Sequence, residues 1–160
     1  MSRITLPAGD LPDTAKLFSL HPALGKALAG LSTAIYSQDA IDLRVREAVR
    51  MRIAHINQCT LCISFRFGEQ AQAVGIDEAF YAAIAEWRSS TLFSEREKVA
   101  IEYAEQFAQD HLSLDQAFFD QMHRHFSDGE IFALTAIIAG LMANGRILQV
   151  LQVAQESCAI

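Results

Sequence analysis

The sequence predicts an all-α fold, a single-domain helical bundle of about seven or eight helices that assembles into an oligomer. Apolar residues recur at three- and four-residue spacing along most of the chain, and helix-capping residues precede several of these stretches. Few stretches alternate apolar and polar residues as strands do. The 160 residues are 51% hydrophobic and 20% charged, which is sufficient for one globular domain with a substantial core.

The helical domain spans residues 1–160, and its first twelve residues form an extended N-terminal segment. Pro12 and Pro22 then start helices over residues 13–19 and 22–37, because proline suits the first turn of a helix. Asp42 precedes a longer helix, whose apolar residues recur at helical spacing: Leu43, Val45, Val49, Ile53 and Ile56.

Asn57 is expected to cap the next helix, which carries the run CTLCISFRFGEQAQAV and ends at Gly75. Asp77 starts a shorter helical segment that continues to Trp87. Both starts depend on a short polar side chain that accepts a hydrogen bond from a backbone amide without a partner in the helix.

Three later helices have clearer starts, because a serine is followed three residues on by an acid or an amide. Ser94, Ser113 and Ser127 open helices that run to about residues 110, 126 and 155. The last helix is apolar around most of its circumference, so it must be buried in the core or against another subunit. This much apolar helix in a small chain predicts a homo-oligomer.

Composition narrows the function classes. A net charge of −6 and a pI near 5.3 argue against a nucleic-acid partner, which requires a basic face. The longest apolar run, residues 131–143, is shorter than the roughly 20 residues of a membrane span. The N-terminus does not resemble a signal peptide, and three cysteines are an odd and small number. We therefore expect a cytoplasmic protein that binds neither nucleic acid nor membrane.

Cys59 and Cys62 lie three residues apart in the run INQCTLCISFR and are the main candidates for chemistry. At a helix start, the free amides and the helix dipole lower the pKa of a thiol. The spacing also allows the two sulfurs to form a reversible disulfide. Alternatively, both cysteines are simply small apolar residues in the core.

A zinc site is the third interpretation of this pair, since zinc sites use the same spacing. It requires two further ligands, and the candidates are His111, His123, His125 and Cys158. His123 and His125 are two residues apart on the expected helix and point in different directions, and the chain has no second Cys-x-x-Cys pair. We therefore expect neither a metal nor another bound cofactor.

Three further residues are candidates for support of the cysteines. Glu47 lies twelve residues before Cys59 and can act as a base or hold a proton relay, although the residues alone favour ion pairs with neighbouring arginines on a solvated face. His55 can serve as a base or simply interact with carbonyls at a helix end. Arg66 lies one turn after Cys62 and can stabilise a thiolate, but its pKa is too high for proton transfer.

Residues 46–75, REAVRMRIAHINQCTLCISFRFGEQAQAVG, resemble the alkylhydroperoxidase D-like branch of the carboxymuconolactone decarboxylase superfamily. The later runs LFSEREKVAIEYAEQFAQD and FSDGEIFALTAIIAGLMANGRI are similar to two later helices of that family. The resemblance covers about residues 40–150. Its most specific elements are the glutamate twelve residues before the cysteine pair and the SDGEI start of the final helix.

The resemblance implies an all-helical fold assembled as trimers, hexamers or related oligomers, and a thiol peroxidase activity. It assigns Glu47 as a relay glutamate and Cys59 and Cys62 as the dithiol. Leu61 and Arg66 stand where the best-described members place two relay histidines, so weak peroxidase turnover is expected. True carboxymuconolactone decarboxylases generally lack the cysteine pair, which favours redox chemistry here.

The leading hypothesis is therefore a thiol-dependent peroxidase or disulfide oxidoreductase that reduces hydroperoxides. Cys62 is expected to attack the peroxide and Cys59 to resolve it, although the helix start favours Cys59 as the thiolate. An external dithiol, of the thioredoxin or lipoyl type, would reduce the disulfide. One alternative is a cofactor-free decarboxylase or isomerase of a lactone-like acid that uses Glu47, His55 or Arg66. Another is a non-catalytic oligomer or redox sensor.

Overall fold

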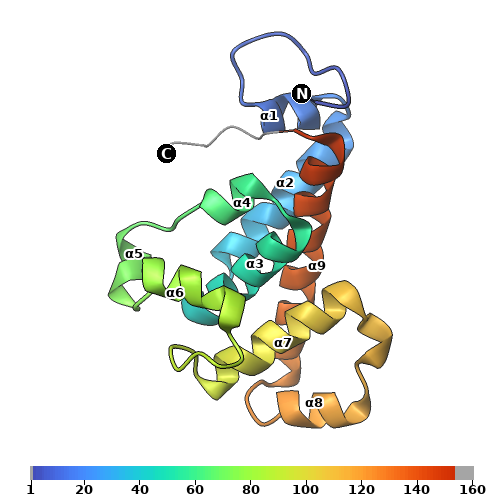
Figure 1. Ribbon diagram of the computed structural model, residues 1–160. Coiled ribbons are helices and arrows are strands. Elements are labelled where there is room, and N and C mark those ends of the chain that lie inside the picture. The colour runs from blue at the N-terminus through green and yellow to red at the C-terminus, as the bar shows by residue number, and fades with distance from the viewer. Residues whose placement is uncertain (1, 154–160) are drawn as a thin grey trace.

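The computed structural model describes residues 2–153, and within this range the chain is helical without a strand (Figure 1). The all-α prediction is confirmed. The helices and 3-10 turns of the described range are α1 (Asp13–Ser19), α2 (Pro22–Ser37), α3 (Leu43–Asn57), α4 (Thr60–Ser64), α5 (Glu69–Ala73), α6 (Glu78–Ala83), η1 (Ile84–Glu86), α7 (Glu95–Gln109), η2 (His111–Ser113), α8 (Gln116–Met122) and α9 (Asp128–Leu151).

Helix α3 lies at the centre of the bundle and packs against both α7 and α9. Val45, Val49 and Ile53 face a core shared with α7, α8 and α9. Ala48 and Met51 face a second core, shared with α6 and η1. Helix α3 is therefore buried on most of its sides, including the positions of two of its arginines, Arg46 and Arg50.

The expected capping residues account for most of the helix starts. The Asp42 carboxylate accepts a hydrogen bond from the Val45 amide at 3.0 Å, and Asp77 caps α6 in the same way. Ser94 and Ser127 each form a reciprocal capping box with the glutamate three residues on. The starts of α3, α6, α7 and α9 are thus fixed locally, by one side chain at α3 and α6 and by two at α7 and α9.

The helix expected from Ser113 to about residue 126 is wrong at both ends. Residues 111–113 form the 3-10 turn η2, and the Ser113 hydroxyl donates to the Asp110 carbonyl at 2.7 Å instead of capping a helix. Asp115 is the actual cap, accepting from the Phe118 amide at 2.9 Å, and α8 ends at Met122. A carboxylate two residues later has replaced the serine in the same role.

The long helix expected from Asn57 to Gly75 is also wrong. Asn57 is the last residue of α3, and Gln58 leaves that helix in the left-handed conformation with φ of 52°. Cys59 is the cap of α4, which ends after five residues at an extended Phe65. The expected single helix is therefore divided into α4 and α5, which explains why the described range holds more helices than the seven or eight expected.

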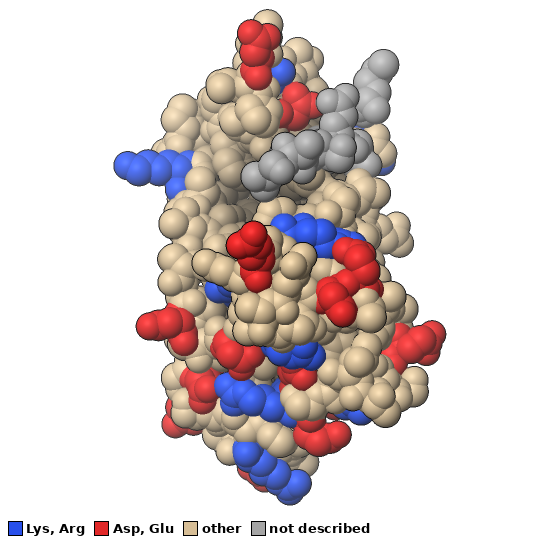
Figure 2. Space-filling view, turned by 90° about the vertical axis from the view of Figure 1, so that its left-hand side faces the viewer, with Lys and Arg blue, Asp and Glu red and all other residues tan. Residues whose placement is uncertain are grey.

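Helix α9 is long and apolar enough to cross a membrane by length and composition alone. It packs along α2 and against α3 and α7 (Figure 1). One such helix is weak support for a membrane span, because the core helix of a water-soluble bundle passes the same test. Figure 2 shows acidic and basic side chains intermixed over the lower part of the face that α5 and α6 occupy, with no extended patch of either sign.

Candidate active site

The two cysteines lie at the start of α4 and are joined by a disulfide. Their Cα atoms are 5.2 Å apart, within the usual range for a disulfide. The Cys59 sulfur caps α4 and accepts a hydrogen bond from the Cys62 amide at 3.3 Å. The turn at Gln58 and the short helix that follows thus place the two sulfurs together.

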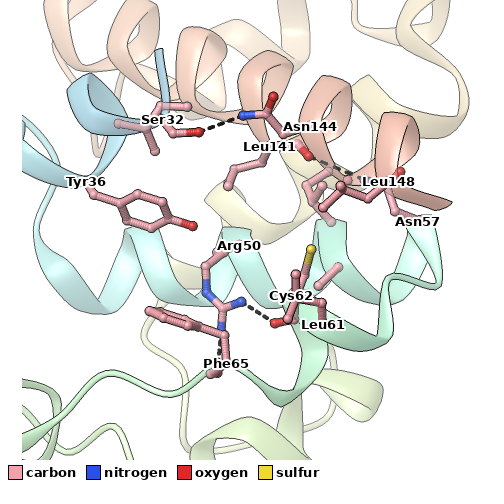
Figure 3. Close-up of a pocket in the computed structure, with 14 residues that line it drawn as sticks. Ser32, Tyr36, Arg50, Asn57, Leu61, Cys62, Phe65, Leu141, Asn144 and Leu148 are labelled. Atoms are coloured by element: carbon pink, nitrogen blue, oxygen red, sulfur yellow. Dashed lines mark hydrogen bonds between the residues drawn. The ribbon is translucent and has the colours of Figure 1, made fainter. Parts of the chain in front are cut away.

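The two sulfurs differ in their surroundings. Cys59 is only 3% exposed and does not line the neighbouring cavity. Cys62 is half-buried and lines a cavity of about 170 Å³ between α2, α3, α4 and α9. Figure 3 shows the Cys62 sulfur pointing towards the α9 side of this space. A molecule that enters the cavity therefore meets Cys62 first.

The cavity wall is largely apolar. Its apolar members are Ile35, Ile53, Ala54, Leu61, Phe65, Leu141, Gly145 and Leu148, and its polar members besides Cys62 are Ser32, Tyr36, Arg50, Asn57 and Asn144. Two of the polar groups bind each other, since the Asn144 amide donates to the Ser32 hydroxyl at 2.8 Å. An apolar cavity of about 150 Å³ holds a benzene molecule. This site therefore accommodates a compact apolar group.

Glu47 forms a buried ion pair with Arg50, one turn further along α3. Arg50 donates from Nε and Nη2 to the two carboxylate oxygens at 2.7 and 2.6 Å, and the two side chains are 0% and 3% exposed. Burial acts to lower the pKa of Arg50, but the hydrogen-bonded Glu47 carboxylate more than offsets this and the pKa is raised. The partner is thus an arginine, as the residues alone favoured, but the pair is buried instead of solvated.

Arg50 also binds the segment that carries the cysteines. Its Nη1 donates to the Cys62 carbonyl at 2.5 Å, and its Nη2 donates to the Phe65 carbonyl at 3.2 Å. These carbonyls lie where α4 ends, so the guanidinium supplies partners that a longer helix would otherwise provide. Arg50 was not expected in this role. The three-residue spacing from Glu47 indicates only the ion pair, not these bonds to distant carbonyls.

Arg66 and His55 lie outside the cavity. Arg66 binds the Glu78 carboxylate at 2.7 Å, and its guanidinium lies 4.0 Å from the centre of the Tyr81 ring. His55 lies in the last turn of α3, where burial and the charges of Arg52 and Arg50 lower its pKa. Arg66 and His55, which were expected to support the thiolate, thus point away from it. Of the two positions where the resemblance places histidines, Leu61 lines the cavity and Arg66 does not.

Tyr36, in the last turn of α2, is a cavity residue that sequence reasoning missed. Figure 3 shows its hydroxyl pointing into the space between Arg50 and Leu141. The only sequence signal was its place at the end of a helix, which is too general to indicate a site.

In the described part of the chain, the histidines considered for zinc form no metal site with Cys59 and Cys62. His123 binds the Asp128 carboxylate at 2.9 Å, and His111 lies in η2. Among residues 2–153 no group of three histidine, cysteine or acidic side chains is close enough to hold a metal ion. Cys158 lies outside the described residues.

Comparison with known proteins places this site in a family. Residues 22–106, a range that includes α2, α3 and the cysteine pair, match the carboxymuconolactone decarboxylase family. The chain belongs to that family. It is also 31% identical over 121 residues to the uncharacterized protein YnjA of Escherichia coli, a match that covers 75% of this chain and 66% of YnjA.

Several solved structures share the fold. A peroxidase-related protein from Ralstonia eutropha with an alkylhydroperoxidase AhpD core superposes with a TM-score of 0.78 at 16% identity, over 97% of this chain and 92% of the other. A protein of unknown function from Agrobacterium tumefaciens, suggested to be an AhpD antioxidant defence protein, gives 0.77 at 19% identity over 100% of both chains.

A third structure has a different activity. The debrominase Bmp8, solved as a cysteine-to-alanine variant with 2,3,4-tribromopyrrole, gives a TM-score of 0.75 at 24% identity, over 92% of this chain and 79% of Bmp8. At these identities the superpositions establish the fold alone. The family and the debrominase on this fold support enzymatic potential for the chain.

Proposed function

We propose that this protein is a thiol-dependent oxidoreductase that reduces organic hydroperoxides, with Cys62 as the attacking and Cys59 as the resolving cysteine. The observation that carries the proposal is the unequal surroundings of two disulfide-bonded sulfurs. Cys62 lines the cavity and Cys59 is buried beside it. A substrate in the cavity reaches only the first sulfur, and the second is positioned to form the disulfide.

The reaction begins from the reduced pair. The Cys62 thiolate attacks the terminal oxygen of the hydroperoxide, so an S–O bond forms, the O–O bond breaks, and the electron pair remains on the departing alkoxide. Protonation of the alkoxide gives the alcohol, and Cys62 becomes a sulfenic acid. The Cys59 thiolate then attacks the Cys62 sulfur, so the S–S bond forms and the S–O bond breaks, and the departing hydroxide takes a proton from solvent to become water. One hydroperoxide is reduced by two electrons and the dithiol is oxidised.

An external dithiol completes the cycle, and the geometry favours attack on Cys62. Attack there expels Cys59 as a thiolate, whose sulfur already accepts a hydrogen bond from the Cys62 amide. This bond stabilises the leaving group, and a more stable leaving thiolate leaves faster. The reductant is therefore expected to be a narrow dithiol, of the thioredoxin or lipoyl type, whose thiolate reaches the cavity.

The cavity also bears on substrate choice. Its volume of about 170 Å³ and mostly apolar wall suit a hydroperoxide with a compact branched or aromatic group. Burying about 100 Å² of apolar surface contributes roughly 2.5 kcal/mol, which corresponds to about a 70-fold difference in reactivity at low concentration. Cumene hydroperoxide is therefore expected to oxidise the protein faster than hydrogen peroxide.

The protein is proposed to work as a homo-oligomer in the cytoplasm. Large apolar side chains are exposed on α2 and α9, which lie side by side: Leu24, Leu31, Phe132 and Val150. Association of these faces would remove them from water. Sedimentation velocity of the purified protein tests this, and a monomer at micromolar concentration contradicts it.

Stopped-flow oxidation of three reduced proteins tests the central assignment. Cys158→Ser serves as the parent, so that only two thiols are counted, and Cys59→Ser and Cys62→Ser are made in that background. Cumene hydroperoxide is expected to oxidise the parent and Cys59→Ser at similar initial rates, with the sulfenic acid trapped by dimedone only in Cys59→Ser. Cys62→Ser is expected not to react. Identical thiol kinetics in all three proteins would overturn the proposal.

The rival activities predict different results for the same proteins. A cofactor-free decarboxylase or isomerase would keep its turnover after both thiols have been alkylated. A non-catalytic protein would show cysteines of ordinary pKa, near 8.5, and would form no disulfide under mild oxidation.

A further inference from the structure

The proposed reaction requires a proton for the departing alkoxide, and the family's histidine positions do not supply it. Leu61 has no acidic proton to donate, and Arg66 lies outside the cavity in an ion pair with Glu78. Glu47 is fully buried, and both of its carboxylate oxygens accept from Arg50. His55 does not line the cavity. The donor must therefore come from another residue or from water.

The geometry points to Tyr36 as the general acid of the proposed reaction, donating its phenolic proton to the alkoxide that leaves when Cys62 attacks the hydroperoxide. This inference rests on the proposed function. Tyr36 and Cys62 line the same small cavity from opposite elements, α2 and α4. In Figure 3 the Tyr36 hydroxyl points into that space, between Arg50 and Leu141.

The other polar groups of the cavity wall are poor proton donors. The Arg50 guanidinium is held in the charged form by Glu47. Asn57 and Asn144 are amides, and the Ser32 hydroxyl is a far weaker acid than a phenol. Apart from the Cys62 thiol itself, Tyr36 is thus the lining side chain of the described residues best suited to hold a proton at neutral pH and pass it to a strongly basic alkoxide.

Packing fixes the Tyr36 ring in its orientation. Its centroid lies 6.4 Å from that of Phe65 and 5.9 Å from that of Phe67, and the Arg46 guanidinium lies 5.9 Å from the ring centre. Arg46 also donates to the Tyr36 carbonyl at 3.0 Å. A hydroxyl on a ring held from several sides needs little reorganisation to meet the alkoxide.

The protonation state of Tyr36 suits an acid. Burial raises the pKa of Tyr36, Arg50 acts to lower it, Glu47 raises it and Arg46 lowers it, with a net increase. The hydroxyl is therefore protonated at pH 7 before the reaction. Tyr36 is also 40% exposed, so solvent can return the proton between turnovers. In the balanced step, the proton moves from the Tyr36 oxygen to the alkoxide, and water then reprotonates the phenolate.

Tyr36→Phe tests this inference, with Tyr103→Phe as the matched control. Tyr103 is a buried tyrosine outside the cavity, and its hydroxyl binds Thr135 at 2.7 Å. Each reduced protein is mixed with cumene hydroperoxide and, separately, with iodoacetamide. Alkylation releases iodide and needs no proton donor, so it measures only the access and nucleophilicity of Cys62.

General acid assistance is typically worth 100-fold or more, so Tyr36→Phe is expected to slow oxidation by about 100-fold and to leave alkylation unchanged. Tyr103→Phe is expected to match the parent in both reactions. Equal oxidation rates for Tyr36→Phe and the parent, or equal losses in both reactions, would overturn the inference. A parent that alkylates but does not react with peroxide would refute the proposed function itself.

A second measurement uses the parent protein alone, so it does not depend on whether a variant folds. Oxidation of the parent by cumene hydroperoxide is expected to be slower in deuterated water than in ordinary water, because a proton is transferred to the alkoxide in the transition state. Alkylation, compared at the same thiolate fraction, is expected to proceed at the same rate in both solvents. Equal oxidation rates in the two solvents would mean that no general acid acts, and Tyr36 would then have no part in the step.

Discussion

Glu47→Gln removes one charge from the buried pair that holds the cysteine segment. The substitution keeps the size of the side chain and one acceptor oxygen, but it leaves the Arg50 guanidinium charged at 3% exposure. Breaking a buried ion pair by changing one partner typically costs about 3–5 kcal/mol, because the remaining charge is uncompensated. With both hydrogen bonds at 2.6–2.7 Å, we expect a loss in this range.

Urea unfolding at fixed protein concentration measures the loss, with Glu78→Gln as the control. Glu78 also binds an arginine, Arg66, but its side chain is 77% exposed, so its substitution is expected to change the unfolding free energy little. The double variant Glu47→Gln, Arg50→Met removes both charges and should recover part of the loss. A Glu47→Gln protein as stable as Glu78→Gln would refute the buried pair as the support of this site.

The remaining predictions concern packing and pH. Gly145→Ala is expected to destabilise the protein by about 1–3 kcal/mol, because the added methyl would lie 2.6 Å from the Asn57 amide. Gly30→Ala has open space and should stabilise α2 by up to about 1 kcal/mol, and thermal unfolding compares the two. Hydrogen bonds from Ser127, then Arg96, lower the pKa of Glu130 from 4.5 to about 2, so its stabilisation is present above pH 4.5 and is lost as the pH falls towards 2. Glu130→Gln should therefore be less stable than the parent at pH 7 and approach it near pH 2, and equal differences at both pH values would contradict this.

The parts of the fold that could be predicted from the sequence are those fixed by local chemistry. Asp42, Asp77, Ser94 and Ser127 cap helices within one turn of themselves, and each start was expected. The start predicted at Ser113 was wrong because Asp115, two residues later, caps the helix instead with a charged acceptor. Local signals therefore identify a helix better than they choose between two neighbouring caps.

The division between α4 and α5 depends on a distant group and had no local signal. The Arg50 guanidinium binds the Cys62 and Phe65 carbonyls, twelve and fifteen residues further along the chain. The sequence shows Arg50 among other arginines, in a pattern typical of a solvated face. Only the three-dimensional structure shows that α3 is enclosed by two cores and that this arginine is buried.

The candidate site also combines features set by residues close in sequence with features that depend on tertiary packing. The cysteine pair and Glu47 could be identified from their spacing, because residues close in sequence and a family resemblance define them. Tyr36 could not, since it reaches the cavity through the packing of α2 along α9. Which cysteine faces the cavity likewise depends on the turn at Gln58, which ends one helix and re-aims the next.

The most direct test of the central claim is the mass and thiol count of the reduced protein after one equivalent of cumene hydroperoxide. We expect the loss of two hydrogens, the disappearance of two thiols, and a disulfide that maps to the peptide containing Cys59 and Cys62. An unchanged mass with all thiols free, while the peroxide remains unconsumed, would contradict this claim.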